Sequence, residues 1–284
     1  MKRIELIIVG CLFAAFIVLA VCRQKIISDV PSQTVGSQEN SSESMPDLES
    51  SESEGEASES SAVGVWPQTS VTEHDPENGI QGGFTTRDIS YLDDAVFIGD
   101  SRTQGLQLGT GLSTPRFLAE RGLSVDKVDE EAIFQLSDGS NGTIYDVLDE
   151  RSYGKIYLMF GVNELGWVYS ETFIEYFRDI IQEIQDLQPG SVIYVQGILP
   201  VTASKSSEGD VYTNDKVHEW NPLIEQMAHE EGCVYLNPGE ALCDETGALP
   251  EEAAVDGVHL TPEYCQKWLD YLLTHTAASE AAWQ

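Results

Sequence analysis

The chain has 284 residues, and its 15 basic and 48 acidic side chains give a formal net charge of −33. Residues 26–86 contain 12 acidic side chains and no Lys or Arg, and from Arg87 onward 11 basic residues stand against 35 acidic ones. Such a surface repels phosphate backbones, and no basic stripe with interleaved aromatic residues is present, so the composition argues against nucleic-acid binding.

The N-terminal segment predicts a membrane anchor or an export signal over residues 1–25. Residues 6–22 form a run of 17 uncharged, mostly apolar residues, close to the ~20 that a helix needs to cross a bilayer. We expect a single-pass anchor at the cell membrane with the bulk of the chain outside the cell. The alternative is secretion after signal cleavage, because Val18 and Ala20 suit the positions before a cut.

Residues 26–87 predict a disordered, acidic tether. The stretch 37–61 is dominated by Ser and Glu, so it cannot bury enough apolar surface to offset the entropy of ordering. Repulsion between like charges would keep the segment extended, which suits a domain held away from a membrane. The folded domain is expected over residues 88–277, followed by a C-terminal tail over residues 278–284.

From Asp88 onward, short apolar runs alternate with helical patterns, which is typical of β-α units around a mostly parallel sheet. Apolar residues recur at helical spacing in residues 173–187 and 217–228. The last helix is expected to begin at Thr261, a suitable cap, with Pro262 at its first position. Strands are predicted at Ala95–Ile98, Lys155–Phe160, Ser191–Ile198, Cys233–Leu236 and, with a weaker pattern, Ser124–Val128.

Three polar clusters follow predicted strands or precede the last helix. Gly-Asp-Ser at 99–101 ends the first strand, Gly-Val-Asn-Glu at 161–164 follows the second long one, and Asp-Gly-Val-His at 256–259 precedes the last helix. In open α/β sheets, ligands bind beyond the carboxyl ends of the strands. We therefore expect all three clusters at one rim of the sheet.

The residue types of these clusters indicate nucleophilic catalysis. Serine needs a base within hydrogen-bond reach and a third group that orients that base. His259 can accept the proton of Ser101, and Asp256 can hold the other imidazole nitrogen. The Ser101 main-chain amide and the Asn163 side-chain amide can supply donors to a tetrahedral oxyanion.

In this order and spacing, the motifs resemble those of the SGNH hydrolases, also called GDSL esterases, over roughly residues 88–275. Each motif alone is also compatible with a helix-entry turn or a bend. The resemblance implies a three-layer α/β/α, flavodoxin-like fold with a mostly parallel five-stranded sheet of order 2-1-3-4-5. It also implies Ser101 as nucleophile, His259 as base, Asp256 as its orienter and Asn163 as an oxyanion donor.

The chain departs from the family pattern at three places. Gly122 is the nearest candidate for the second-block oxyanion glycine, but that glycine often falls about three residues later, where this chain has Val125. Arg102 stands where the family usually has Leu, and Glu164 where it usually has Asp. Arg102 is a candidate substrate-binding residue that attracts a carboxylate or sugar acid, and pairing with local acids is the equally weighted alternative.

Other site types find less support in the sequence. There is no Gly-x-Ser-x-Gly elbow around Ser101 and no Gly-rich phosphate loop with a following Lys. His218 and His229 would be about 16 Å apart along one helix. We therefore expect no metal and no cofactor. Cys233 is expected to be a buried free thiol, with a disulfide to Cys243 as the alternative.

The sequence thus predicts an extracytoplasmic serine esterase of the carboxylesterase or acetylesterase type. We expect it to hydrolyse short acyl esters, above all O-acetyl groups on carbohydrate, through an acyl-serine. Its expected partners are an acylated small molecule or glycan and the membrane at its N-terminal helix. Two alternatives stay open, an O-acyltransferase of the same architecture acting on surface glycans and a non-catalytic surface-binding domain.

Overall fold

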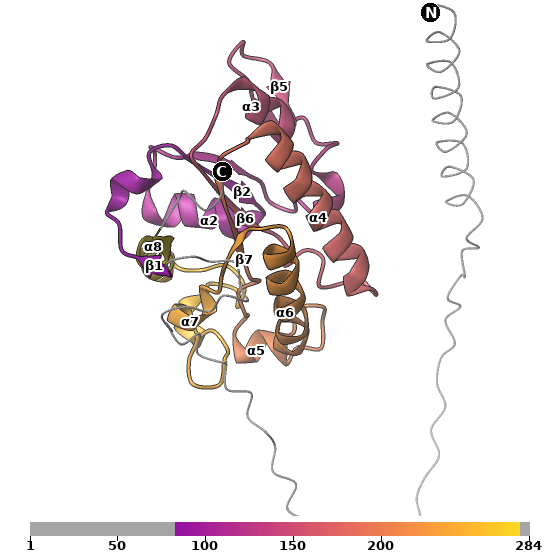
Figure 1. Cartoon of the computed structure of the whole chain (residues 1–284). Coiled ribbons are helices and arrows are strands. Elements are labelled where there is room, and N and C mark those ends of the chain that lie inside the picture. The colour runs from indigo at the N-terminus through magenta and orange to yellow at the C-terminus, as the bar shows by residue number, and fades with distance from the viewer. Residues whose placement is uncertain (1–82, 279–284) are drawn as a thin grey trace, which may run out of the picture. The chain divides into compact units, whose positions relative to one another are not determined.

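The computed structural model of the chain describes residues 83–278 (Figure 1). The predicted anchor over residues 1–25 and nearly all of the predicted tether over 26–87 lie outside the described residues. The same holds for the tail from residue 279. Within residues 83–278, no helix combines the length and the hydrophobicity that a bilayer crossing requires.

A five-stranded parallel sheet forms the centre of the fold, in the order β3-β2-β6-β7-β8. Numbered along the chain, this order is 2-1-3-4-5, and the predicted fold class is confirmed. Every residue of β2, β6 and β7 is buried, as expected for parallel strands covered on both faces. The strands are β2 Ala95–Gly99, β3 Arg116–Ala119, β6 Lys155–Met159, β7 Val192–Gln196 and β8 Val234–Leu236.

Helices and short elements connect these strands. The α-helices are α2 Ser101–Thr110, α3 Ile144–Glu150, α4 Ser170–Leu187, α5 Ala203–Ser206, α6 Asn214–Glu230, α7 Gly239–Leu242 and α8 Pro262–Thr274. The 3-10 helices are η1 Ile89–Leu92, η2 Val125–Lys127 and η3 Glu251–Ala253. Two small antiparallel pairs join β1 Phe84–Thr85 to β9 Thr276–Ala277 and β4 Phe134–Gln135 to β5 Asn141–Gly142.

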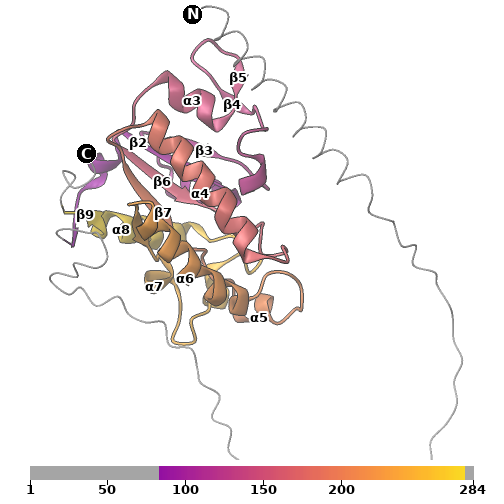
Figure 2. The same cartoon turned by 45° about the vertical axis from the view of Figure 1, so that its right-hand side comes forward.

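The helices cover both faces of the sheet in three layers (Figures 1 and 2). On one face, residues of α3, α4 and α6 pack with strand residues such as Ile156. On the other face, Leu106 of α2 and Trp268 of α8 pack with strand residues such as Phe97. Alternate strand residues therefore enter two separate cores, because successive side chains of a strand point to opposite faces.

Four aromatic rings stack across the sheet on the face that α2 and α8 cover. The ring centroids of Phe117 and Phe97 are 4.8 Å apart, those of Phe97 and Tyr157 4.6 Å, and those of Tyr157 and Tyr194 4.5 Å. Cross-strand pairs of this kind stabilise a sheet. They hold β2 and β6 in register, and the ends of these strands carry the polar clusters.

The predicted strand at Ser124–Val128 is wrong. This segment forms the 3-10 helix η2, in which the Lys127 amide donates to the Ser124 carbonyl. Val125 and Val128, three residues apart, are both buried, which is the spacing of a 3-10 turn. The edge strand is β3, in which only Leu118 is fully buried.

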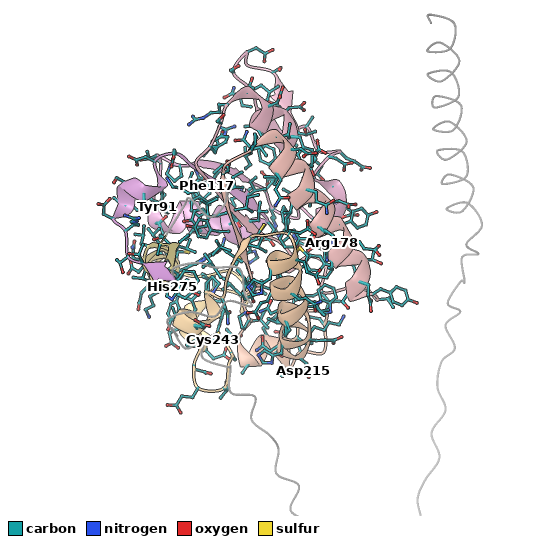
Figure 3. All side chains as sticks on the ribbon, viewed as in Figure 1. Tyr91, Phe117, Arg178, Asp215, Cys243 and His275 are labelled. Atoms are coloured by element: carbon teal, nitrogen blue, oxygen red, sulfur yellow. The ribbon has the colours of Figure 1, made fainter. Side chains whose placement is uncertain are left out.

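An ion-pair cluster joins α4 to the end of α6. Arg178, labelled in Figure 3, contacts Glu230 at 2.6 Å and also binds Glu231. Both side chains of the first pair are partly exposed, so the pair is expected to add little to global stability. It links α4 to the residues at the end of α6.

Candidate active site

Ser101 stands at the junction of the buried strand β2 and helix α2. Asp100 is the N-cap of α2, and its Oδ1 accepts a hydrogen bond from the Arg102 amide at 2.8 Å. Gly99 is required for close packing, because a Cβ there would lie 2.3 Å from the Met159 carbonyl oxygen of β6. The tight strand-to-helix turn therefore holds Ser101 at the first position of the helix.

His259 and Asp256 meet Ser101 from a turn more than 150 residues further along the chain. The Ser101 Oγ lies 2.9 Å from His259 Nε2, and His259 Nδ1 lies 2.7 Å from Asp256 Oδ2. An antiparallel bridge between Ala254 and Leu260 closes the turn. The arrangement allows a proton to pass from the hydroxyl to the imidazole while the carboxylate holds the opposite ring nitrogen.

Asp256 is held as a carboxylate by its own turn. Burial acts to raise its pKa, but hydrogen bonds from the His259 amide and ring and from the Val258 amide outweigh this and lower the pKa to about 2. The two amides donate to Asp256 Oδ1 at 2.8 and 3.0 Å. Oδ2 is thereby left for the imidazole, and Asp256 is ionised throughout the neutral range.

Two amide groups are candidate oxyanion donors, the Asn163 side chain and the Ser101 main chain. Asn163 donates one side-chain hydrogen to the Leu123 carbonyl at 2.8 Å, which leaves its second Nδ2 hydrogen for another acceptor. The first N–H groups of a helix have no intrahelical partner, and within residues 83–278 no hydrogen bond uses the Ser101 amide. Both groups are thus available to stabilise negative charge.

Gly122 and Val125 do not join this group of donors. Gly122 lies exposed at the surface with φ of +80°, in a turn that the Leu123 amide closes on the Glu120 carbonyl. The Val125 amide donates to Glu164 Oε1 at 2.7 Å. The expected oxyanion role of Gly122 therefore gains no support from the structure, and the Val125 amide is already engaged.

Arg102 points into the protein. It is 3% exposed, and its guanidinium donates to the main-chain carbonyls of Leu199 and Pro200 after β7. Burial lowers its pKa to about 10, and the charges of Asp100 and Asp256 act in the opposite sense. Since the side chain is buried and binds these carbonyls, we assign Arg102 to the support of this loop near local acids rather than to substrate binding.

Glu164 is a buried carboxyl beneath the site, and the sequence marked it only as a departure from a family pattern. It is 0% exposed, Oε1 binds the Val125 amide, and Oε2 has no hydrogen-bond partner within the described residues. Burial, with the nearby charge of Asp100, raises its pKa to about 8. In the sequence, both Glu164 and Val125 depart from the family pattern, and in the structure these two residues contact each other.

We expect Glu164→Gln to change how stability depends on pH. Between the ordinary value of 4.5 and about 8, the folded chain keeps a proton that the unfolded chain releases. Raising the pH through this range therefore lowers the free energy of unfolding, by up to about 1.4 kcal/mol per pH unit for one group. Glutamine does not titrate, so the stability of the variant relative to the wild type should rise from pH 5 to pH 8 in urea unfolding.

Asp100, whose pKa burial raises to about 6, is present in both chains, so the comparison removes the part of its contribution that does not depend on the charge of Glu164. The matched control is Glu175→Gln, which makes the same substitution on the exposed face of α4 and is measured at the same pH values. A stability difference between Glu164→Gln and wild type that is equal at pH 5 and pH 8 would contradict the assignment.

Among the described residues, no group of three or more His, Cys, Asp or Glu side chains could hold a metal ion. Cys233, Cys243 and Cys265 are free thiols, and Cys233 is buried. The expected free thiol at Cys233 is confirmed, and the alternative disulfide to Cys243 is not formed.

The fold and the site together define an α/β serine hydrolase in which the serine follows the first strand of a parallel sheet. A family model for GDSL-like lipases and acylhydrolases matches residues 97–266, more than half of the chain. The chain therefore belongs to the GDSL-like lipase/acylhydrolase family and is an ester-hydrolysing enzyme.

The chain is also similar to solved structures. One from Streptococcus pneumonia, named as a platelet activating factor, is 26% identical, covers 63% of this chain and 81% of its own, and has a TM-score of 0.50. A GDSL-like lipase from Bacteroides thetaiotaomicron is 14% identical, with coverages of 66% and 88% and a TM-score of 0.48. A carbohydrate acetylesterase from Sinorhizobium meliloti is 12% identical, with coverages of 63% and 95% and a TM-score of 0.45. No curated protein matches the sequence.

Proposed function

We propose that this enzyme is an extracytoplasmic serine esterase that removes short acyl groups, above all O-acetyl groups, from carbohydrate. The observation that carries the proposal is the hydrogen-bonded chain from Ser101 Oγ to His259 Nε2 and from His259 Nδ1 to Asp256 Oδ2. This geometry supports covalent catalysis at Ser101.

In the proposed first half-reaction, Ser101 Oγ attacks the ester carbonyl carbon and its proton passes to His259 Nε2. The carbonyl oxygen becomes an oxyanion, to which the Ser101 amide and the Asn163 Nδ2 group donate. The carbon–oxygen bond to the sugar then breaks, and His259 returns the proton to the leaving sugar oxygen. The products are a free sugar hydroxyl and an acyl ester on Ser101.

In the second half-reaction, His259 takes a proton from water, and the resulting hydroxide attacks the acyl-Ser101 carbonyl. The second tetrahedral oxyanion collapses, the bond to Ser101 Oγ breaks, and His259 protonates that oxygen. The carboxylic acid leaves and the enzyme is restored. Asp256 stays ionised throughout and stabilises the imidazolium that forms in each half-reaction.

Charged side chains lie beside the turn that carries His259, and they favour a substrate with a short acyl group over one with a long alkyl chain. A Cβ at Gly257 would lie 2.6 Å from Lys205 Cβ, and Lys205 Nζ pairs with Glu208 and Asp210 at 2.6 Å each. Burying a long alkyl chain against such groups would cost their solvation without gaining apolar contact. An acetyl group needs no such surface.

The location outside the cytoplasm rests on sequence features that lie outside the described residues. The uncharged run at residues 6–22 and the acidic segment up to residue 87 favour a membrane-anchored domain carried on a tether, with secretion after cleavage as the alternative. Labelling of intact cells with a membrane-impermeant fluorophosphonate probe tests this. Labelling only after lysis would refute it.

The substrate is tested with the purified full-length chain on O-acetylated xylo-oligosaccharides and on a long-chain lysophosphatidylcholine. We expect acetate release with a kcat/KM at least about tenfold above that for fatty-acid release. Faster cleavage of the lysophospholipid would overturn the proposal. Transfer of acetyl to an added acceptor oligosaccharide in preference to water would replace it by an acyltransferase.

A further inference from the structure

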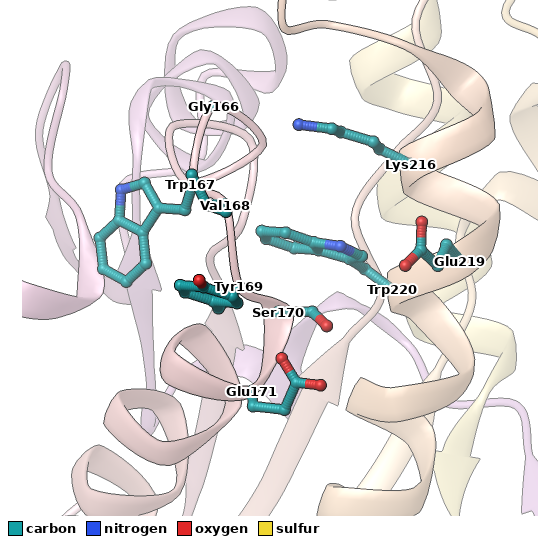
Figure 4. Close-up of a pocket in the computed structure, with 9 residues that line it drawn as sticks. All are labelled: Gly166, Trp167, Val168, Tyr169, Ser170, Glu171, Lys216, Glu219 and Trp220. Carbon is teal, nitrogen blue, oxygen red and sulfur yellow. The ribbon is translucent and has the colours of Figure 1, made fainter.

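A surface pocket of 380 Å³ lies between the segment that follows β6 and the first turns of α6 (Figure 4). Trp167 and Tyr169 line it from the segment before α4, with the Trp167 indole turned away from Lys216, and Trp220 enters it from α6. Lys216 and Glu219 line it from the same face of α6. None of these residues belongs to the proposed catalytic group.

Two of the three aromatic rings are fixed by neighbours. Trp220 is 3% exposed and stacks on Phe173, with ring centroids 5.2 Å apart. The rings of Trp167 and Tyr176 pack edge to face, with their centroids 6.1 Å apart. Because both rings are held by core or flanking residues, the pocket is formed before any ligand enters, as is usual for small-molecule sites.

Exposed apolar side chains gather at the mouth of the pocket. Val168 is 84% exposed and Tyr169 67%, and both line it. Val211, 42% exposed, packs beside Gly166, where a Cβ would lie 3.3 Å from Val211 Cγ1. Single exposed apolar residues need no explanation, but a patch of them around a hollow indicates a binding surface.

The lining selects a ligand with both apolar and hydroxyl faces. A fatty chain would desolvate the exposed carboxylates of Glu171 and Glu219 without offering a donor. An anion would meet these two carboxylates, and the Nζ of Lys216 is already bound to the Leu165 carbonyl. A neutral sugar fits, since its C–H face can pack on the exposed ring of Tyr169 and its hydroxyls can donate to the two carboxylates.

The pocket also lies close to the proposed oxyanion donor. Gly166 follows Asn163 by three residues, so their Cα atoms are at most about 11 Å apart. The chain turns tightly here, with the Trp167 amide donating to the Glu164 carbonyl at 2.7 Å. We infer that this pocket is a subsite for a neutral sugar residue of the glycan whose neighbouring residue carries the ester, an inference that rests on the proposed function.

The test replaces Tyr169 in the full-length chain, because an exposed side chain can be removed without disturbing the core. For an acetylated xylotetraose, Tyr169→Ala should lower kcat/KM roughly three- to tenfold through a higher KM, as expected for one lost aromatic contact. The ratio of this kcat/KM to that for p-nitrophenyl acetate should fall by the same factor. Tyr169→Phe, which keeps the ring, should restore the ratio to within twofold.

Leu108→Ala is the matched control, since Leu108 is an exposed apolar residue of α2, 77% exposed, that does not line the pocket. This variant should match the wild type on both substrates. If Tyr169→Ala leaves the ratio of the two kcat/KM values unchanged, whether both values fall equally or neither falls, the inference is overturned.

A binding measurement separates failure of the subsite from failure of the proposed function. Unacetylated xylotetraose is titrated onto the Ser101→Ala chain while tryptophan fluorescence is followed, since Trp167 and Trp220 line the pocket. A saturable change that Tyr169→Ala weakens at least threefold supports the subsite even if no ester is hydrolysed. No saturable change, or one that Tyr169→Ala leaves intact, refutes the subsite whatever the enzyme's activity.

Discussion

Replacement of Ser101 by alanine is expected to lower kcat for ester hydrolysis by roughly 10⁴-fold or more. The change removes the Oγ that lies 2.9 Å from His259 Nε2 and leaves no atom at that position to form an acyl-enzyme. The Ser101 main-chain amide and Asn163 remain, so a small residual rate from binding and oxyanion stabilisation should persist. The loss should lie in kcat, because substrate contacts elsewhere are unchanged.

The measurement pairs acetate release with labelling by a fluorophosphonate probe, which bonds covalently to an activated serine oxygen. Wild type should be labelled and Ser101→Ala should not. The control is Ser152→Ala, which removes an exposed hydroxyl three residues before β6. It lies at the amino end of the strands, opposite to the end that carries Ser101, and this variant should keep both labelling and rate. Full labelling of the Ser101→Ala chain would place the nucleophile elsewhere and end the proposed mechanism.

A measurement of stability distinguishes loss of the nucleophile from loss of folding in Ser101→Ala. Ser101 is the first residue of α2, and the cap interaction there is made by Asp100 rather than by the Ser101 side chain. Removal of the hydroxyl loses one partly buried hydrogen bond, a cost of about 1 kcal/mol. The urea midpoint of Ser101→Ala should therefore stay near that of the wild type while activity is lost.

The central strands could be predicted because strands buried on both faces consist of continuous apolar residues. β2, β6 and β7 are buried at every residue, so they read as continuous apolar runs. β3 is an edge strand with only Leu118 fully buried, and its pattern did not stand out. The apolar pair Val125 and Val128 predicts a strand where the structure has the 3-10 helix η2, because a 3-10 turn and a short strand both place apolar residues close together.

The members of the candidate site could be predicted where a motif fixes a local turn. The order of the Gly-Asp-Ser and Asp-x-x-His motifs along an α/β chain indicated that Ser101 and His259 share a rim, and the structure brings them within hydrogen-bond distance. Side-chain direction could not be predicted in this way. Arg102 follows Ser101 immediately, yet the helical turn directs it inward to the Leu199 carbonyl, which only the packed fold determines.

The contact between Glu164 and Val125 shows a further limit of sequence reasoning. Each residue was visible as a departure from a family pattern, but their separation of 39 residues gives no local signal that one binds the other. The contact depends on the turn after β6 meeting η2, which is a tertiary property. It also engages the Val125 amide, so this amide is not free to act as an oxyanion donor.

Asp256→Asn is expected to lower kcat by about 10³- to 10⁴-fold at neutral pH. The carboxylate Oδ2 accepts from His259 Nδ1 at 2.7 Å, which leaves Nε2 unprotonated and able to take the Ser101 proton. An asparagine amide in its place donates to Nδ1 and favours the tautomer with hydrogen on Nε2. In addition, the neutral amide no longer stabilises the imidazolium.

The turn itself should survive this change, which makes the result a test of role rather than of folding. The asparagine side chain of the variant keeps an Oδ1 for the amides of Val258 and His259, which donate to Asp256 in the wild type. The matched control is Asp244→Asn, because Asp244 also accepts the amide two residues on, from Thr246 at 2.8 Å, in a turn of its own. That variant loses the same charge and should retain wild-type kcat. If Asp256→Asn keeps kcat within threefold while Asp244→Asn does so too, Asp256 only shapes the turn, and His259 must be oriented by another group.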